Sequence, residues 1–258
     1  MTPLRAAKPL ARWRVLVPRG GAYGEGVAVT LRSYGALPVV APMVNFASPE
    51  DVSALTAALR RLEAGEFDWL AVTSAAVVDV LVSQRIRIPD KTKIAAVGET
   101  ANTALTLAGY RVEFAPEADK SMRGLLKEWP ESETAGRVLV PQSNLSEPHL
   151  LADLAEVGLD VEFVTAYRTV GVPISERVAA EVADGRIRAI LVSSGSVARQ
   201  IQAQLAPLPE STIVACIGPR TAFDARAAGL SVDVIAESRT TESLVEGLAE
   251  FAAQASEE

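Results

Sequence analysis

Short runs of aliphatic and β-branched residues alternate along the chain with longer amphipathic stretches rich in alanine and leucine. The run at 69–72 is apolar throughout, as expected for a strand that helices cover on both faces. Strands are expected at 15–17, 69–72, 94–97, 111–114, 138–140, 161–165, 189–192, 213–217 and 232–235, with a proline-bearing extended stretch at 38–46. Helices are expected at 24–34, 51–64, 73–83, 98–109, 121–128, 147–157, 175–183, 194–205, 219–228 and 241–253. This alternation predicts an α/β fold with parallel sheets.

The sequence also repeats itself. The blocks at 72–77 and 96–101 recur at 192–197 and 216–221, both 120 residues later, and Gly109 recurs as Gly229 at the same offset. A third block, at 14–18, recurs at 137–141. A unit of about 120 residues is a duplicated domain, because solenoid elements are only 20–50 residues long. We therefore expect two similar lobes, each a parallel sheet flanked by helices, with a cleft between them that binds a small molecule.

The repeated blocks lie where a strand gives way to a helix. Ligands of parallel sheets bind beyond the carboxyl ends of the strands, and free backbone N–H groups at a helix start attract anions. The residues expected to bind such a ligand are Thr73, Ser74, Gly98, Thr100, Ser193, Ser194, Gly218 and Thr221. A serine or threonine at a helix start is also the usual N-cap, so capping alone is the alternative at each position.

Composition excludes several other classes. A net charge of −7 without a basic stripe argues against nucleic-acid binding, and no stretch is long and apolar enough to span a membrane. With one histidine, His149, and one cysteine, Cys216, neither a zinc site nor a serine-histidine triad is expected. Cys216 lies in an apolar strand, which indicates a buried structural thiol. The glycines at 20–26 do not form a phosphate-binding motif, and no signal peptide is evident, so we expect a cytoplasmic protein.

Four segments together resemble the uroporphyrinogen III synthase family: Asp68–Val77, Ala96–Thr100, Ala166–Thr169 and Ile217–Ala222. The likeness runs from about Trp13 to Leu248. It implies a cofactor-free lyase that closes linear hydroxymethylbilane into uroporphyrinogen III, with loss of water and inversion of the terminal pyrrole ring. The chain would need no metal and no macromolecular partner, and would act as a monomer.

The resemblance also implies that the lobes are not the sequence repeats. One lobe would combine residues 1–38 with 172–258, and the other would span 46–164. Residues 39–45 and 165–171 would be two extended linkers.

By the same resemblance, Tyr167 is the candidate general acid that protonates the departing hydroxyl. The alternative to this role is that Tyr167 is a structural residue that packs between the lobes. Arg19 matches a family arginine that could pair with a substrate carboxylate, or it is a surface arginine on a loop. Ala101 stands where many bacterial members have threonine, which removes a hydroxyl from that position.

Two other classes stay open at this point. A two-lobed sensor of small molecules fits the same architecture, although no signal peptide or DNA-binding helix-turn-helix is present. A nucleotide or sugar-phosphate enzyme is disfavoured because no phosphate loop is found.

Overall fold

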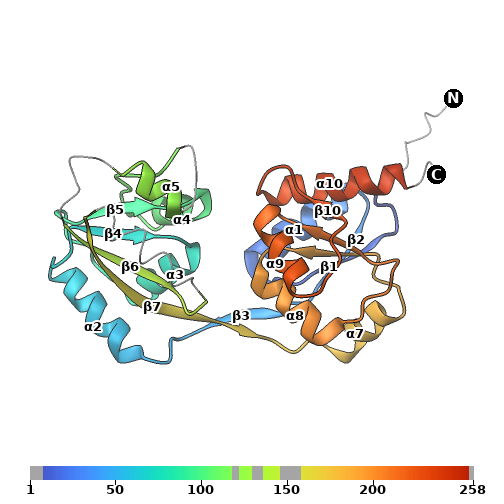
Figure 1. Ribbon diagram of the computed structural model, residues 1–258, viewed down its shortest axis with the longest axis horizontal. Helices are drawn as coiled ribbons and strands as arrows, with labels where there is room; N and C mark the ends of the chain where they lie inside the picture. The colour runs from blue at the N-terminus through green and yellow to red at the C-terminus, as the bar shows by residue number, and fades with distance from the viewer. Residues whose placement is uncertain (1–7, 118–121, 130–135, 146–157, 256–258) are drawn as a thin grey trace. The chain divides into compact units, whose positions relative to one another are not determined.

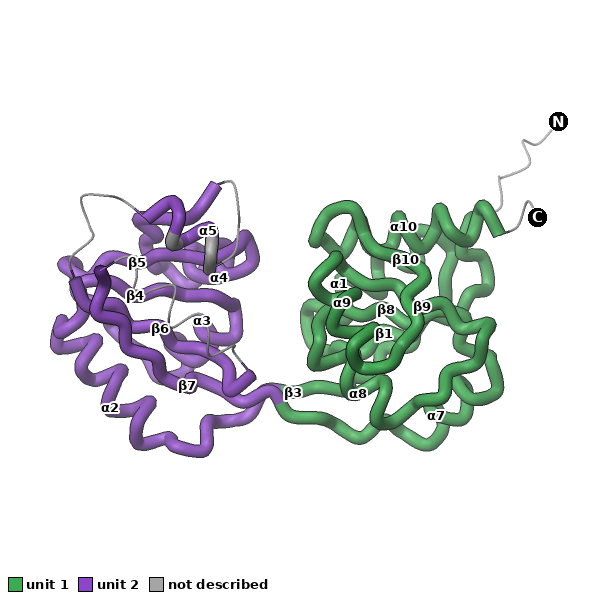
Figure 2. Tube along the Cα trace, in the orientation of Figure 1, with its two compact units in different colours: residues 1–45, 170–258 green, residues 46–169 purple. Residues whose placement is uncertain are grey.

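The chain forms two compact units in the computed structural model, which describes residues 8–117, 122–129, 136–145 and 158–255. Unit 1 contains residues 1–45 and 170–258, and unit 2 contains residues 46–169 (Figure 2). The chain therefore crosses between units twice, in β3 (Val44–Ala47) and in β7 (Asp160–Gly171). No helix among the described residues is both long and apolar enough to cross a membrane.

Unit 1 is built on a five-stranded sheet in the order β10-β9-β8-β1-β2, whose strand pairs are all parallel (Figure 1). The strands are β1 (Arg14–Val17), β2 (Leu37–Val40), β8 (Ala189–Val192), β9 (Ile213–Cys216) and β10 (Val234–Ile235). The helices are α1 (Gly21–Ser33), α7 (Glu176–Ala183), α8 (Gly195–Leu205), α9 (Pro219–Ala227) and α10 (Thr241–Gln254). α1 and α10 cover one face of the sheet, and α7, α8 and α9 cover the other.

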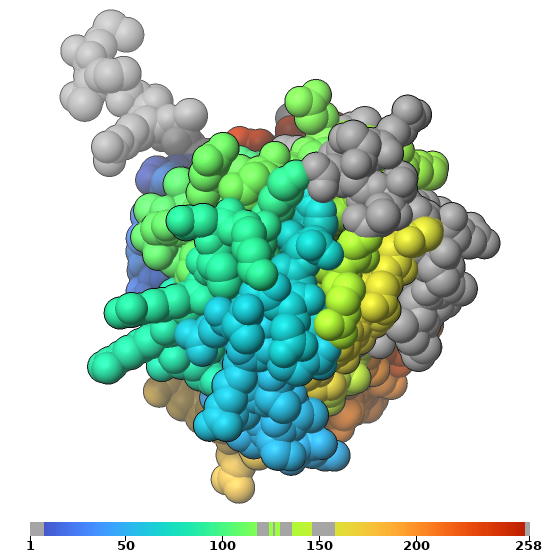
Figure 3. All heavy atoms as spheres, turned by 90° about the vertical axis from the view of Figure 1, so that its left-hand side faces the viewer, coloured from blue at the N-terminus to red at the C-terminus, as the bar shows by residue number. Residues whose placement is uncertain are grey.

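Unit 2 repeats this plan with the sheet order β3-β7-β6-β4-β5. Its remaining strands are β4 (Trp69–Val72), β5 (Lys93–Ala96) and β6 (Arg137–Ser143). Its helices are α2 (Val52–Glu63), α3 (Ala75–Ser83), α4 (Glu99–Leu107) and α5 (Met122–Lys127). α2, α3 and α4 pack on one face, and α5 packs on the other beside Trp69 and Trp129. Figure 3 views unit 2 from the side on which the residues of α2, in cyan, lie along those of β6 and β7.

The duplication is visible in matched hydrogen bonds of the two units. The Thr92 hydroxyl donates to the Phe67 carbonyl at 2.7 Å, and Thr212, 120 residues later, donates to the Ile187 carbonyl at 3.1 Å. The backbone N–H groups of Ile94 and Val214 likewise donate to acidic side chains 19 residues further along, at 2.8 and 2.7 Å. These bonds join strand starts to the loops around them, so the copies share one scaffold.

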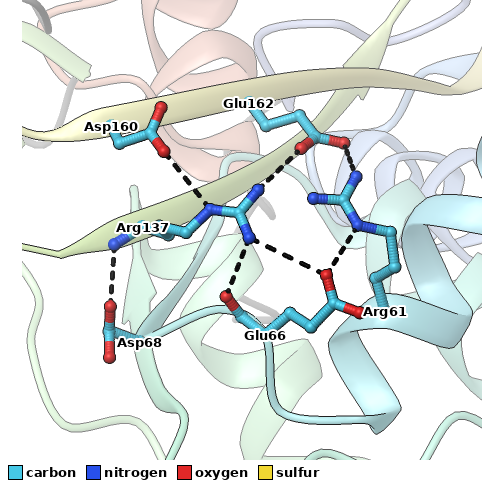
Figure 4. Close-up of polar contacts among 6 residues, drawn as sticks. All are labelled: Arg61, Glu66, Asp68, Arg137, Asp160 and Glu162. Atoms are coloured by element: carbon cyan, nitrogen blue, oxygen red, sulfur yellow. Dashed lines mark hydrogen bonds and ion pairs between the residues drawn. The ribbon is translucent and has the colours of Figure 1, made fainter.

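The amino ends of the strands in unit 2 carry a network of charges (Figure 4). The Arg137 guanidinium lies 3.2 Å from Asp160, 3.6 Å from Glu162 and 3.7 Å from Glu66. Arg61 of α2 pairs with the same two glutamates, at 2.7 Å from Glu162 and 3.0 Å from Glu66. The two arginines are thereby engaged at the edge opposite to the carboxyl ends of the strands.

Unit 1 closes its amino edge differently. Arg14, which starts β1 as Arg137 starts β6, pairs with the buried Glu181 of α7, and Arg177 lies 3.2 Å from the same carboxylate. Hydrogen bonding from Arg14, with a smaller contribution from Arg177, lowers the pKa of Glu181 below its ordinary value against the opposing effect of burial. The carboxylate is therefore charged and paired in the folded unit.

Three sequence expectations need comment. The first helix was expected from Gly24, but α1 starts at Gly21, because the Gly24 N–H donates to the Gly20 carbonyl in a first turn that lies against Arg19. The expected strand at 111–114 is wrong: only Phe114 forms a bridge, to Ala95. The expected helix at 147–157, with His149, lies outside the described residues.

Candidate active site

The predicted site residues lie at the carboxyl ends of the two sheets. Those in unit 2 follow β4 and β5 or lie in β7: Thr73, Ser74, Gly98, Thr100 and Tyr167. Those in unit 1 follow β1, β8 and β9: Arg19, Ser193, Ser194, Gly218 and Thr221. The strand-to-helix turns place them there, since each of these strands is separated by only a short turn from the helix that follows it.

Among these residues, Ser74 and Tyr167 meet directly in unit 2. The Ser74 hydroxyl lies 3.1 Å from the Tyr167 hydroxyl, across 93 residues of sequence. Ser74 is the N-cap residue of α3, but its side chain makes no capping hydrogen bond. The Tyr167 ring packs edge-on against Phe46 of β3, with 5.0 Å between the ring centroids. The tyrosine is thus held on its ring by Phe46 and on its hydroxyl by Ser74.

A second polar group lies beside Tyr167, at the end of β6. The Thr169 N–H donates to the Asn144 side-chain oxygen at 3.0 Å, and the Asn144 N–H donates to the Tyr167 carbonyl at 3.1 Å. The Ser143 hydroxyl lies 3.4 Å from that of Thr169. Sequence reasoning missed Ser143 and Asn144 because it ended the strand at Val140, whereas β6 continues through Pro141 to Ser143. The run of polar residues at 142–144, shortly after the apolar residues 138–140, was the available signal.

A pocket of about 320 Å³ opens beside Tyr167, between the start of α2 and α3. Its apolar walls are formed by Phe46, Val52, Leu55 and Val80, and Tyr167 is also one of the residues that line it. Asp79, one helical turn beyond Ala76 on α3, adds a carboxylate to the wall. The pocket therefore combines mainly apolar walls with one carboxylate, whose charge favours a positively charged group.

Unit 1 presents a different edge. The Ser194 hydroxyl caps α8 by accepting from the Val197 N–H at 3.4 Å, and it lies 2.9 Å from the Ser196 hydroxyl. The Ser193 hydroxyl oxygen is buried and has no hydrogen-bond partner among the described residues. A buried hydroxyl without a partner is unfavourable, and a ligand oxygen at this edge would satisfy it.

Three arginines lie near the starts of helices in unit 1: Arg19, Arg220 and Arg239. Gly218 precedes α9, and a side chain there would be in tight contact with Arg239, whose Cγ lies 3.0 Å from the position of such a Cβ. Arg220, in the first turn of α9, is mostly exposed and lies 3.2 Å from Asp224. The Arg19 guanidinium stacks over the Tyr23 ring at 5.0 Å. Each of the three arginines lies close in sequence to the start of a helix, α9, α10 or α1, where a carboxylate is favoured.

The described part of the chain contains no cluster of three or more histidine, cysteine or acidic side chains that could hold a metal ion.

The model of the uroporphyrinogen-III synthase HemD family matches residues 25–246. The chain belongs to the uroporphyrinogen-III synthase family. No curated protein sequence matches it closely enough to count as a relative. Membership identifies a cyclising lyase that needs no cofactor, and no finding favours the alternative of a small-molecule sensor.

Solved structures of this family share the fold. A mutant uroporphyrinogen III synthase from the extremely thermophilic bacterium Thermus thermophilus superposes with a TM-score of 0.65 and 20% identity, covering 94% of this chain and 99% of its own. The uroporphyrinogen-III synthetase of Helicobacter pylori gives a TM-score of 0.61 and 16% identity, covering 93% and 99%. The two-lobed α/β architecture expected from the sequence is confirmed.

The duplicated positions 101 and 221 differ in chemical character. Thr221 is almost fully buried in the first turn of α9, and its counterpart Ala101 is buried against the core of unit 2. The missing threonine hydroxyl at Ala101 is therefore replaced by apolar packing.

Gly98, the N-cap of α4, has a φ of +85°, a left-handed backbone conformation that glycine adopts without strain.

Cys216 is expected to be inert toward thiol reagents in the folded synthase. It is fully buried at the end of β9, and burial raises the pKa of its thiol to about 11. The thiolate that reacts is therefore scarce at neutral pH. Titration with a chromogenic disulfide at neutral pH should detect no thiol in the native protein and one per chain in denaturant. Rapid labelling of the native protein would contradict the buried position.

Proposed function

We propose that this uroporphyrinogen-III synthase performs its dehydration at Tyr167 and binds the substrate's acidic side chains through the strand-to-helix turns of both units. The observation that carries the proposal is the contact of the Tyr167 hydroxyl with Ser74 at the start of α3, 3.1 Å apart. It brings an acidic O–H group to the carboxyl edge of the sheet, which is where parallel sheets act on ligands.

The chemistry starts with loss of the terminal hydroxyl of hydroxymethylbilane. Tyr167 donates its proton to the leaving oxygen, water departs, and the terminal ring becomes a cationic azafulvene. The pocket beside Tyr167 receives that ring between its apolar walls, and the Asp79 carboxylate stabilises its charge. The azafulvene carbon forms a carbon–carbon bond to the pyrrole at the other end of the bilane. Inversion of that pyrrole requires its existing bond to the neighbouring methylene bridge to break and to re-form at the other α-carbon of the same ring, and the proton lost from that carbon restores the tyrosine. The balance is one bilane converted into one macrocycle and one water.

The eight carboxylates of the substrate require local recognition, because the protein itself carries a net charge of −7. In unit 1 we assign this role to Arg19, to the hydroxyls of Ser193 and Ser194, and to Gly218 and Thr221 at the start of α9. In unit 2 we assign it to the N–H groups that follow Thr73, Gly98 and Thr100. The unpartnered Ser193 hydroxyl, which has no partner among the described residues, and the arginines beside Gly218 support the first assignment.

The lobes of the working enzyme are proposed as residues 1–38 with 172–258, and 46–164, joined through 39–45 and 165–171. The change of unit at residues 45–46 and 169–170 supports this division. We further propose that the synthase acts as a monomer in the cytoplasm; its single cysteine supports a reducing compartment, since no internal disulfide can form.

The deciding experiment is an isomer assay. Freshly prepared hydroxymethylbilane is incubated with and without the protein, and the oxidised products are separated into isomers I and III. Uncatalysed closure gives isomer I, so we expect isomer III to dominate only when the protein is present. No excess of isomer III over the protein-free reaction would contradict the function.

A further inference from the structure

The two copies of the duplicated unit use the same serine in two different ways. Ser74 and Ser194 occupy equivalent positions, 120 residues apart, as N-cap residues of α3 and α8. Ser194 accepts a hydrogen bond from the Val197 N–H at 3.4 Å, which is the ordinary role of serine at this position. Ser74 makes no such bond, and its hydroxyl lies instead 3.1 Å from that of Tyr167.

Two neighbouring differences accompany this change. Ser196, whose hydroxyl lies 2.9 Å from that of Ser194, is replaced in unit 2 by Ala76, so Ser74 has no competing hydroxyl at that position. Most repeated blocks lie 120 residues apart, and the block at 14–18 lies 123 residues before its copy at 137–141. The residues 120 and 123 positions before Tyr167 are Ala47 and Val44, which carry no hydroxyl. Only unit 2 therefore has both the tyrosine and a helix-start serine whose hydroxyl does not cap the helix.

Releasing a capping hydroxyl has an energetic consequence. An uncapped helix start leaves backbone N–H groups without an intrahelical partner, which destabilises the helix. In α3 the loss is partly offset, because the Val77 N–H donates to the Ser74 carbonyl at 3.2 Å. The Ser74 hydroxyl is thus free to hold the Tyr167 hydroxyl beside the helix start.

We infer that Ser74 is a positioning residue for the dehydration step, acting through Tyr167 rather than by binding substrate carboxylates as its sequence position suggests. Its O–H group donates to the Tyr167 oxygen, which directs the tyrosine proton toward the leaving hydroxyl. When that proton is transferred, the same hydrogen bond stabilises the phenolate, helped by the positive end of α3. The inference rests on the proposed role of Tyr167.

A double-mutant cycle tests it, with Ser74→Ala, Tyr167→Phe and the combined variant assayed for isomer III formation. We expect Ser74→Ala to lower kcat roughly tenfold, the value of one neutral hydrogen bond, and to change KM less than about twofold. In the Tyr167→Phe background the same substitution should change kcat less than about twofold, because the group through which Ser74 acts is gone. Ser74→Thr keeps the hydroxyl and should restore most of the lost kcat.

Ser194→Ala is the matched control, since it removes the equivalent serine of unit 1. Its effect on kcat, whatever the size, should be the same factor in the wild-type and Tyr167→Phe backgrounds. Equal factors for Ser74→Ala in the two backgrounds, or a loss that lies in KM, would overturn the inference and return Ser74 to substrate binding.

A second double-mutant cycle measures urea stability of the wild-type protein, Ser74→Ala, Tyr167→Phe and the combined variant, and needs no substrate. It distinguishes failure of the inference from failure of the proposed function. Non-additive urea midpoints for Ser74→Ala and Tyr167→Phe would show that the hydroxyls bond in solution. Additive midpoints would overturn the inference while leaving isomer III formation, and hence the proposed function, unaffected. Absence of isomer III with the wild-type protein would instead remove the proposed function.

Discussion

Tyr167→Phe is expected to lower kcat for isomer III formation about 100-fold while the protein remains folded. A positioned general acid contributes on the order of 10²–10⁴ in rate, and phenylalanine removes only the acidic O–H group. The ring should keep its edge contact with Phe46, so the shape of the pocket is preserved. The measurement is initial-rate kinetics with the spontaneous reaction subtracted, together with circular dichroism to verify folding.

Tyr110→Phe is the matched control. Tyr110 is also in unit 2 and half-buried, and its hydroxyl donates to the Ile86 carbonyl at 3.0 Å, away from the strand ends that carry the site. Burial, with a smaller effect of Glu63, raises the pKa of Tyr110, so its hydroxyl stays protonated at neutral pH. The control should lose about 1 kcal/mol of stability and keep the wild-type kcat. Wild-type turnover in folded Tyr167→Phe would remove the tyrosine from the chemistry and leave positioning of the bilane as the main source of catalysis.

The sequence predicted the fold well because its signals are local. Uninterrupted apolar runs such as 69–72 indicated strands covered on both faces, and glycine after the last apolar residue indicated helix ends, as at Gly35 and Gly109. The constant spacing of 120 residues between the repeated blocks then indicated two similar sheets. The helix start at Gly21 was missed because closely spaced glycines are typical of a loop, whereas here they let the first turn pack tightly.

The candidate site was only partly predictable, because its decisive contacts join distant segments. A serine that begins a helix predicts a cap, which holds at Ser194 and fails at Ser74. A nearby difference, Ala76 in place of Ser196, does not predict the change by itself; the partner of Ser74 is a tyrosine that β7 places beside it, 93 residues later in the sequence. The charge network of Arg61 and Arg137 was equally hidden, since each residue alone resembles an ordinary surface arginine in the sequence.

Both arginines of that network lie over the ring of Phe67. Its ring is 1% exposed in the core of unit 2, and the guanidiniums of Arg61 and Arg137 lie 5.0 and 5.1 Å from its centroid. Two like charges on one ring would repel each other without the carboxylates of Glu66 and Glu162, which contact both arginines. The ring therefore fills the core and also supports the charges that close the amino edge of the sheet.

Phe67→Ala is expected to lower the free energy of unfolding of unit 2 by about 4 kcal/mol, from the lost burial, the cavity and the two ring–cation contacts. Phe67→Leu should lose only about 1.5 kcal/mol, because an aliphatic residue, Ile187, fills the equivalent position in unit 1. Phe223→Ala, at a ring that is 65% exposed, should change stability by less than about 0.5 kcal/mol.

Urea unfolding measures these changes for unit 2 separately when Trp13 is first replaced by phenylalanine in every variant. The remaining tryptophans, Trp69 and Trp129, pack edge-to-face in the core of unit 2 with 4.8 Å between their ring centroids, so their fluorescence follows that unit alone. Equal losses for Phe67→Ala and Phe67→Leu would show that the stacked guanidiniums, rather than core volume, determine the stability of this edge. Losses below about 1 kcal/mol for both would contradict the assignment of Phe67 as the residue that unites core and charge network.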